Sequence, residues 1–353
     1  MYFSKNIKLK NININHSRTF VVAEVSANHC GKITILKKLI LRLKKIKVDA
    51  IKLQAYEADT ITIKSSNQDF KINKKNKWAK YKTLYDLYKT AQTPFNWFPE
   101  IFEFCKKNKI IVFASVFDEK SLKILEKLKC PAYKLASPEI TDIPLIKKIA
   151  QTKKPIIISN GLSNFKDLSL AIKTVKKEKN KKLIVLKCTS SYPAPINEIN
   201  LKTMLEIKNY FKVLTGYSDH AEDINTAIHA ASLGACMIER HVKLEKTKSV
   251  DSFFSSNISD FKKMIEIIRS NEKASGKIDF NISKSSKQNM NGRRSIYVTK
   301  DIKKGEKFST ENIKSIRPTF GLHPKYLEFF LNKKSNQNIK LGSRLQWKHL
   351  VKN

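Results

Sequence analysis

The chain is built from short apolar runs that alternate with longer polar stretches. The runs are rich in β-branched residues and apolar at almost every position, which is typical of parallel strands buried on both faces. Stretches between them, such as GKITILKKLILRLKKIK, repeat apolar residues with a period of about 3.6, which predicts amphipathic helices. The runs cover residues 20–27, 50–56, 110–117, 132–137, 155–161, 183–190, 215–220 and 237–242.

The number of these runs decides between two α/β architectures. Eight strands that alternate with helices favour a closed (β/α)8 TIM barrel over an open doubly wound sheet. Residues 261–275 have the pattern of a last barrel helix. The sequence therefore predicts a TIM-barrel domain over residues 1–275.

Two other regions depart from the regular alternation. The polar segment GKIDFNISKSSKQNMNG predicts a linker at residues 276–292, and short apolar pieces with turn signals after it predict a small β-rich domain at 293–353. The connection from Glu57 to Lys109 is unusually long for a barrel. Its aromatic residues either pack a lid over a site or contact a ligand directly.

The chain is strongly basic. Lys and Arg total 69 against 31 Asp and Glu, a formal net charge of +38. The lysines are spread over nearly every segment, with no groove-reading helix or stacking platform beside them. We therefore interpret them as solvated helix faces and expect no nucleic-acid partner, although the positive field favours an anionic substrate.

Cysteine usage and the lengths of apolar runs bear on location. The five cysteines are widely spaced and form no C-x-x-C pair, as expected of reduced thiols in the cytosol. The sequence contains no run of 18 apolar residues and no pattern of a secretory signal. We expect a cytoplasmic protein without a membrane partner.

Polar side chains occur near the carboxyl end of every predicted strand. In a TIM barrel these ends meet at one face, where active sites are built. Polar groups inside apolar strands are costly unless a site uses them, so the pattern predicts an enzyme. The residues are Glu24, Asn28, His29, Lys52, Gln54, Ser115, Lys134, Ser137, Glu139, Ser159, Asn160, Thr189, Ser190, Tyr192, Ser218, Asp219, His220, Glu239 and His241.

These residues suggest three kinds of chemistry. Two lysines among serines form a cradle for a phosphate or carboxylate, although either lysine can equally form a Schiff base. His220 and His241, on neighbouring strands, either share a divalent metal ion or are hydrogen-bonded core residues. Glu24 and Glu139 are candidates for acid–base work. The residues by themselves thus predict a barrel enzyme with an anionic substrate and leave the metal open.

Several segments resemble the sialic acid synthases, a family that uses phosphoenolpyruvate. They are AEVSANHCG, AIKLQAY, AYKLASPEITDIPLI, IIISNG, KCTSSYPAPINEINL, GYSDH and IERHV, and DIKKGEKFSTENIKSIRP resembles the family's antifreeze-like SAF domain. SANH, KCTSSYP and RPTFGLHPKY most resemble the branch that makes pseudaminic acid. The reaction implied is condensation of phosphoenolpyruvate with 2,4-diacetamido-2,4,6-trideoxy-L-altrose and water, giving pseudaminate and phosphate by C–O cleavage.

The resemblance also implies a role for each matching position. The implied catalytic residues are Glu24, Lys52 and Glu139. The implied ligands of a divalent cation (Mn2+, Mg2+ or Co2+) are His220 and His241. Phosphoenolpyruvate is implied to contact Lys52, Ser115, Lys134, Ser137, Ser159, Ser190 and Ser218. The second substrate, an N-acetylated amino-sugar aldehyde, is implied to contact Gln54, Tyr192, Asp251 and Arg317.

In this family an SAF-domain arginine, matched by Arg317, reaches the sugar across a dimer interface, which implies a domain-swapped homodimer. Asn160 occupies a position where the family usually has Thr, and Pro138 one where it has Gly or Phe. The segment SVDSFFSS replaces the G-P-D-H form of neuraminate synthases. These differences lie near the substrate and bear on the sugar assignment more than on the reaction class. Three alternatives remain open. They are an N-acetylneuraminate or legionaminate synthase, a Schiff-base barrel aldolase, and a non-catalytic binder of nucleic acid or carbohydrate.

Overall fold

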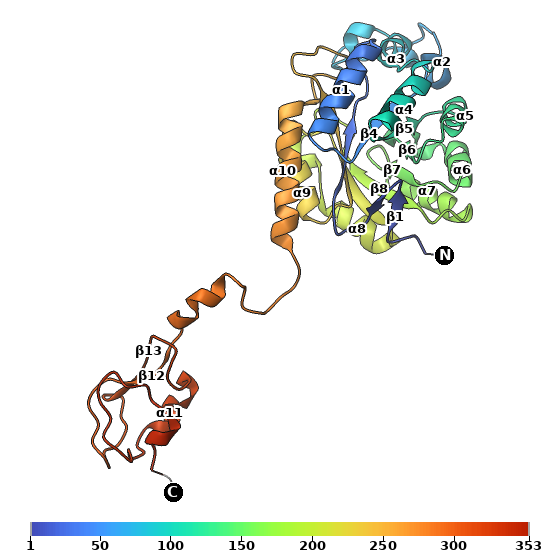
Figure 1. Cartoon of the computed structure of the whole chain (residues 1–353). Coiled ribbons are helices and arrows are strands. Elements are labelled where there is room, and N and C mark those ends of the chain that lie inside the picture. The colour runs from blue at the N-terminus through green and yellow to red at the C-terminus, as the bar shows by residue number, and fades with distance from the viewer. Residues whose placement is uncertain (1, 352–353) are drawn as a thin grey trace. The chain divides into compact units, whose positions relative to one another are not determined.

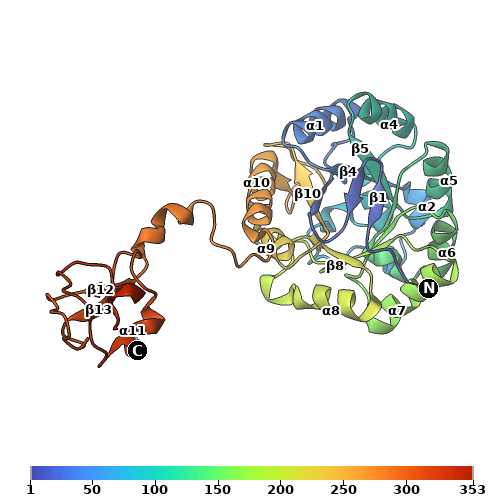
Figure 2. The ribbon, with the colours of Figure 1, turned by 60° about the horizontal axis from the view of Figure 1, so that its bottom comes forward.

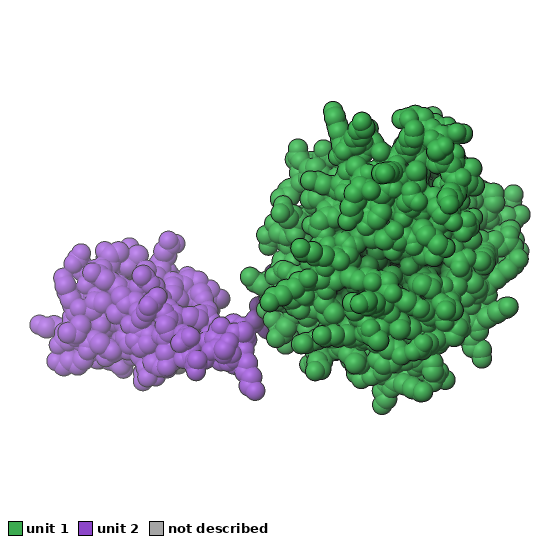
Figure 3. All heavy atoms as spheres, turned by 90° about the horizontal axis from the view of Figure 1, so that it is seen from above, with its two compact units in different colours: residues 1–276 green, residues 277–353 purple. Residues whose placement is uncertain are grey.

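The computed structural model describes residues 2–351, and this part of the chain forms two compact units. The first unit ends at Gly276 and the second begins at Lys277. Figure 3 shows the two units in different colours. No helix within the described residues is long and apolar enough to cross a membrane.

The first unit is a closed barrel of parallel strands, which confirms the predicted TIM barrel (Figure 1). The strands pair in chain order, and the last closes the barrel by pairing with both its predecessor and the first. All of them coincide with predicted apolar runs, because both faces of each strand are buried. They are β3 (Phe20–Glu24), β4 (Ala50–Ala55), β5 (Ile111–Val116), β6 (Tyr133–Leu135), β7 (Ile156–Ser159), β8 (Leu183–Cys188), β9 (Leu214–Asp219) and β10 (Met237–Lys243).

Helices surround the barrel strands (Figure 2). Local sequence sets several helix starts: Asp118 and Asn164 cap α5 and α7 in capping boxes, and Asp142 caps α6. The helices are α1 (Ile33–Lys45), α2 (Ala58–Ile61), α3 (Leu84–Ala91), α4 (Trp97–Lys107), α5 (Glu119–Lys127), α6 (Ile143–Gln151), α7 (Phe165–Lys177), α8 (Lys202–Phe211), α9 (Asn225–Ser232) and α10 (Ile258–Ser275). Short 3-10 turns are η1 (Gln68–Phe70), η2 (Ala79–Tyr81), η3 (Ser137–Thr141) and η4 (Ile196–Glu198).

Lysine occupies the position just after the C-terminus of most of these helices, where glycine is common. Glycine favours the position after a helix C-terminus because it adopts left-handed backbone angles without strain. Here lysines adopt them, with φ between 54° and 62°, one or two residues after α1, α4, α5, α6, α7 and α8. The six positions are Lys47, Lys109, Lys129, Lys153, Lys179 and Lys212.

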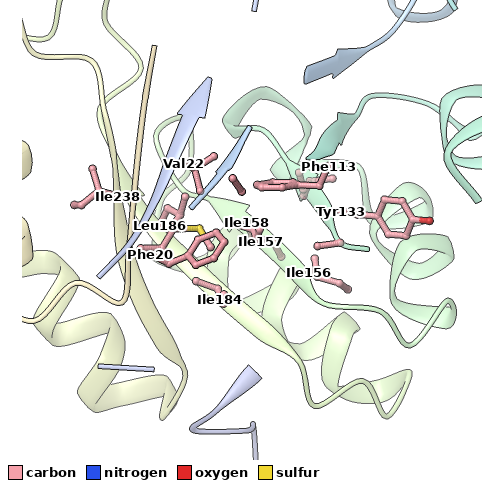
Figure 4. Packing of buried hydrophobic residues seen from close by; sticks show 14 of the residues in the cluster. Phe20, Val22, Phe113, Tyr133, Ile156, Ile157, Ile158, Ile184, Leu186 and Ile238 are labelled. Carbon is pink, nitrogen blue, oxygen red and sulfur yellow. The ribbon is translucent and has the colours of Figure 1, made fainter. Parts of the chain in front are cut away.

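The barrel interior below the strand ends is a continuous apolar core. Figure 4 shows part of it, with Phe20, Phe113 and Leu186 contributed by three strands. An N-terminal hairpin that the sequence analysis did not predict, β1 (Ile7–Leu9) with β2 (Ile12–Ile14), adds its alternate side chains to this core. It lies at the amino end of the strands, where Ser4 N–H donates to the carbonyl of Lys181 just before β8.

The second unit has its own small core, as expected of the predicted β-rich SAF module. Its strands β12 (Ser295–Val298) and β13 (Ile313–Ile316) pair antiparallel, and isolated bridges such as Ile302 with Ile339 replace longer strands. Its other elements are η5 (Ser286–Gly292), η6 (Pro324–Tyr326), α11 (Leu327–Phe330) and η7 (Trp347–His349). Its buried core consists of Ile296, Val298, Ile302, Phe308, Ile313, Phe330, Ile339 and Leu345.

A buried arginine connects the last two barrel strands on the side away from the barrel axis. Arg240 on β10 forms an ion pair with Asp219 at the end of β9, and both side chains are almost completely buried. Its guanidinium also donates to Ser256 Oγ at 2.5 Å and to the carbonyls of Ala221 and Glu222 at 2.9 and 3.0 Å. Arg240 therefore fixes the loop that follows β9 and also holds Ser256, in the segment after β10.

We predict that Arg240→Met lowers the free energy of unfolding of the barrel by about 3–5 kcal/mol, because Asp219 would remain as a buried charge without its partner. Chemical denaturation of the purified variant measures this. The matched control is Lys262→Met, which breaks an exposed pair with Glu266 and should change stability by less than about 0.5 kcal/mol. Equal effects of the two substitutions would contradict the prediction.

Candidate active site

Strand register places polar side chains of neighbouring strands at the same level of the barrel. His241 of β10 is paired with Glu24 of β3, and Glu24 with Lys52 of β4. Farther round, Ser115 of β5 is paired with Lys134 of β6. Side chains alternate between the two faces of a strand, so this register brings the whole set to one end of the barrel interior.

Two lysines and two glutamates form a buried cluster of charges at this level. Lys52 Nζ lies 2.7 Å from Glu239 Oε1 and 2.9 Å from Glu24 Oε2, and Lys134 Nζ lies 3.6 Å from the same Glu239 oxygen. Ser218 Oγ donates to that oxygen at 3.2 Å. The four charged side chains are at most 4% exposed. Because buried charges require partners, Glu239 allows both ammonium groups to stay inside the barrel.

Lys52 and Glu239 keep their charges at neutral pH. Burial would raise the pKa of Glu239, but Lys134 and Lys52 hold it at about 2. Burial lowers the pKa of Lys52 to about 8, against the opposing effect of Glu239. Glu24 differs from Glu239. It forms an ion pair with Lys52, but neither of its carboxylate oxygens has a hydrogen-bond partner among the described residues. Its carboxylate is therefore available to a ligand or a proton.

Serine hydroxyls gather beside this cluster at the end of β7. Gly161 N–H donates to Ser137 Oγ at 2.9 Å. A Cβ at position 161 would lie 2.2 Å from Ser190 Oγ and 2.8 Å from Ser137 Oγ, so both hydroxyls can approach only because the residue is glycine. The hydroxyls of Ser115 and Ser159 are buried and have no partner among residues 2–351. Together with the lysines, these donors make a cradle suited to an oxyanion.

The two histidines at the ends of β9 and β10 face each other. The ring centroids of His220 and His241 lie 5.3 Å apart. His220 Nδ1 lies 3.0 Å from the carbonyl of Thr189, so this nitrogen donates and the other remains open to a ligand. His241 Nδ1 is buried without a partner in the described chain. Burial, followed by the charges of His220 and Lys52, lowers the pKa of His241 well below its usual range and keeps its ring neutral.

Two imidazoles at this spacing have the donor chemistry of a divalent metal site. No group of three or more His, Cys, Asp or Glu side chains that could hold a metal ion occurs within residues 2–351. A metal bound here would therefore take two protein nitrogens and leave its other positions to water or substrate. The unpartnered Nδ1 of His241 agrees with such a use.

A cavity of about 310 Å3 opens above the histidines. Tyr192 packs against His220 with ring centroids 4.4 Å apart, and Phe254 lies 4.7 Å from the His241 ring. Asp251 accepts a hydrogen bond from the hydroxyl of Ser26. The cavity is lined by Gln54, Tyr56, Ile72, Asn76, Trp78, Leu84, Leu87, Tyr88, Ala91, Tyr192, His241, Val250, Asp251 and Phe254.

The predicted site residues of the barrel are thus largely brought together. Gln54, Tyr192 and Asp251 line the same cavity as His241. Arg317 belongs to the second unit, directly after β13, so its predicted contact with the sugar remains a prediction.

Other polar residues at the strand ends are occupied by protein partners. His29 is fully buried, with Nε2 3.2 Å from Thr93 Oγ1. Asn160 Oδ1 accepts from the backbone N–H of Cys188 at 3.1 Å and so connects the ends of β7 and β8. Asp219 is paired with Arg240. These side chains support the site without facing it.

The sequence predicts Glu239 at a strand end without assigning it to the site, and it does not point to Gly161 or Trp78. For Glu239 a signal was available, since it lies two residues before His241 and therefore on the same face of the strand. The close approach of Gly161 to Ser190 and the position of Trp78 depend on contacts between segments far apart in the chain.

Burial raises the pKa of Glu139, at the η3 turn after β6, to about 7. Its folded pKa lies above the ordinary value of 4.5, so the folded state holds this proton more strongly than the unfolded state. Glu139 therefore makes the free energy of unfolding fall as pH rises from about 5 to 8. Oε2 is buried without a partner in the described part of the chain.

We predict that Glu139→Gln becomes more stable relative to wild type as pH is raised from about 5 to 8, by about 1–3 kcal/mol, because the amide cannot ionise. Urea denaturation of both proteins at several pH values measures the difference. His29, whose pKa burial lowers to about 4, changes stability in the opposite direction but equally in both proteins. A difference that is constant with pH would contradict the prediction.

Comparisons with known proteins identify the family of the chain. The profile of the NeuB family matches residues 39–279, and that of the SAF domain matches residues 293–351. A pseudaminic acid synthase from Campylobacter jejuni serotype O:2 is 41% identical over 330 residues, covering 93% of this chain and 96% of its own. A pseudaminic acid synthase from Helicobacter pylori is 38% identical, covering 92% of this chain and 96% of its own.

Among solved structures, the N-acetylneuraminic acid synthetase of Leptospira borgpetersenii superposes with a TM-score of 0.70 at 27% identity. The superposition covers 82% of this chain and 96% of that protein. The family profile extends over most of the barrel that carries the charged cluster and the paired histidines. The chain belongs to the NeuB family.

Proposed function

We propose that the protein condenses phosphoenolpyruvate with 2,4-diacetamido-2,4,6-trideoxy-L-altrose and water, and so makes pseudaminate and phosphate. One observation carries the proposal: a buried cradle of two lysines and several hydroxyls lies beside two facing histidines. The sugar assignment is supported by two pseudaminic acid synthases at 41% and 38% identity, against 34% and 30% for N,N'-diacetyllegionaminic acid synthases.

In this proposal the cradle binds phosphoenolpyruvate. Lys52 and Lys134 supply positive charge to its phosphate and carboxylate, and Glu239 holds both ammonium groups in place. The phosphate and carboxylate oxygens take the hydroxyl donors of Ser115, Ser137, Ser159, Ser190 and Ser218. The use of this metabolite agrees with the cytoplasmic location expected from the sequence.

The metal proposed at this site would be held by His220 and His241, with Mn2+, Mg2+ or Co2+ as the candidates. When bound, such an ion acts as a Lewis acid that polarises a carbonyl oxygen. The histidines are suited to it because their rings face each other and His241 is kept neutral by burial. Thr189 orients the His220 ring through its carbonyl.

Proton transfer is assigned to the two carboxyl groups of the site. Carbon three of phosphoenolpyruvate forms a bond to the aldehyde carbon, and the aldehyde oxygen takes a proton from Glu139, which is partly protonated near pH 7. Water then adds to carbon two and gives its proton to Glu24. The bond between carbon two and the phosphate oxygen breaks, phosphate leaves with the remaining hydroxyl proton, and a 2-keto acid remains.

The sugar lies above the histidines in this proposal, against Gln54, Tyr192 and Asp251. Arg317 of the SAF domain would contact its acyl group from the partner subunit of a domain-swapped homodimer. This assignment rests on the match of the SAF profile to residues 293–351 and on the family resemblance of the segment around Arg317.

A Schiff-base aldolase is the main alternative chemistry, and the ion pairs of Lys52 argue against it. A Schiff base needs a neutral amine, whereas Glu24 and Glu239 both lie within 3 Å of the Lys52 ammonium. With a pKa of about 8 this lysine is mainly charged at pH 7. Lys134 shares the same Glu239 oxygen.

The proposal predicts that purified protein with Mn2+ releases phosphate from phosphoenolpyruvate when 2,4-diacetamido-2,4,6-trideoxy-L-altrose is present, and that a chelator stops the release. N-acetylmannosamine in a parallel reaction should give little or none. Colorimetric phosphate detection measures both. Release with N-acetylmannosamine alone would overturn the sugar assignment but keep the chemistry, and release unaffected by chelator would overturn the metal.

A second prediction concerns the metal itself. His241→Ala should weaken Mn2+ binding at least about tenfold, because one of the two proposed protein ligands is lost. Titration of free Mn2+ by electron paramagnetic resonance measures this without any turnover. The matched control is His229→Ala, an exposed histidine on α9 that should bind Mn2+ as wild type does. Unchanged binding by both variants would remove His241 from the metal site.

A further inference from the structure

A small apolar cluster lies apart from the barrel core and forms one wall of the cavity. Its buried members Ala27, Leu87, Ala91 and Val250 are between 3% and 9% exposed. The partly buried residues packed against them are Ile72, Trp78, Tyr81 and Tyr88. These side chains come from the long connection after β4, from the loop after β3 and from the loop after β10. We call this set the lid cluster.

Hydrogen bonds of side chains and backbone hold the lid cluster in a defined position. Trp78 Nε1–H donates to the carbonyl of Val250 at 3.0 Å and so connects the two segments that contribute most of it. Ile72 N–H donates to the carbonyl of Lys82 at 2.8 Å, which folds the polar part of the connection back on itself. Thr83 then caps α3, the helix that carries Leu87 and Ala91. The apolar wall is therefore part of the folded structure.

The cavity consequently has walls of two kinds. The strand ends and the loops nearest to them contribute Gln54, Tyr192, His241 and Asp251, which are polar and surround the proposed aldehyde position. The lid contributes mainly apolar side chains, with Asn76 and the phenolic hydroxyl of Tyr88 as polar exceptions. Its apolar residues in the lining are Ile72, Trp78, Leu84, Leu87, Ala91 and Val250. An open-chain sugar with its aldehyde at the histidines has its last carbons nearest the lid.

We propose, on the basis of the proposed function, that Leu87, Ala91 and Val250 select sugars whose terminal carbon is a methyl group over those that carry a hydroxyl there. A methyl group adds apolar contact with the lid cluster. A hydroxyl in its place loses its hydrogen bonds to water and finds no replacement on the side chains of Leu87, Ala91 and Val250. Rejection of an added hydroxyl by an apolar pocket reaches at most about 100-fold, so we expect a preference of about 10–100-fold.

The test compares kcat/KM for 2,4-diacetamido-2,4,6-trideoxy-L-altrose with that for its 6-hydroxyl counterpart, 2,4-diacetamido-2,4-dideoxy-L-altrose. Wild type should prefer the deoxy sugar. Val250→Thr, which replaces one methyl group by a hydroxyl at nearly constant volume, should reduce that preference by about fivefold or more. Ala91→Ser makes a smaller change of the same kind and should act in the same direction if the threonine variant does not fold.

The matched control is Val175→Thr, a fully buried valine on α7 outside the cavity, which should keep the wild-type preference. Equal efficiency of wild type on both sugars would overturn the inference. A preference that survives in both lid variants would overturn it as well. Absence of turnover with either sugar, in wild type, would instead overturn the proposed function, so the two failures are distinguishable.

Discussion

The structure depends on a balance of charge inside the barrel. Two lysine ammonium groups are buried where most TIM barrels have apolar side chains, and they can be there only because two glutamates share the same space. Glu239 contacts both lysines, so the positions of the two cations are fixed relative to each other before any substrate binds. A cradle preorganised in this way does not need to reorganise when an anion enters it.

The surroundings of the cluster support this balance at several levels. Parallel pairing sets the height of each side chain, the apolar core and the N-terminal hairpin close the barrel below, and the Arg240–Asp219 pair fixes the loop that carries His220. Above the cluster, Tyr192 from the loop after β8 and Phe254 from the loop after β10 pack on the histidines. The charged side chains are therefore buried, and the low dielectric of their surroundings strengthens each electrostatic contact between them.

The sequence predicted the barrel and most of its polar residues because both leave local signals. Strands buried on both faces are continuous apolar runs. A lysine or glutamate at the end of such a run is costly to bury, so its presence indicates a functional site. The partnership of Glu239 with Lys52, the approach of Gly161 to Ser190 and the lid cluster join segments far apart in the chain, so no local pattern reports them. The hairpin of β1 and β2 is not predicted, because each strand has only three residues and its apolar residues alternate with polar ones.

The lysines that follow six of the barrel helices in left-handed conformation have a consequence for the molecule as a whole. Each such lysine lowers the free energy of unfolding by about 1 kcal/mol relative to glycine. The attraction between its cation and the helix C-terminus partly offsets this cost. Because the helices run opposite to the strands, these positions lie at the end of the barrel away from the site. The barrel thus contains an unused reserve of stability: glycine at these positions would make it both more robust and less basic, with its catalytic face unaltered.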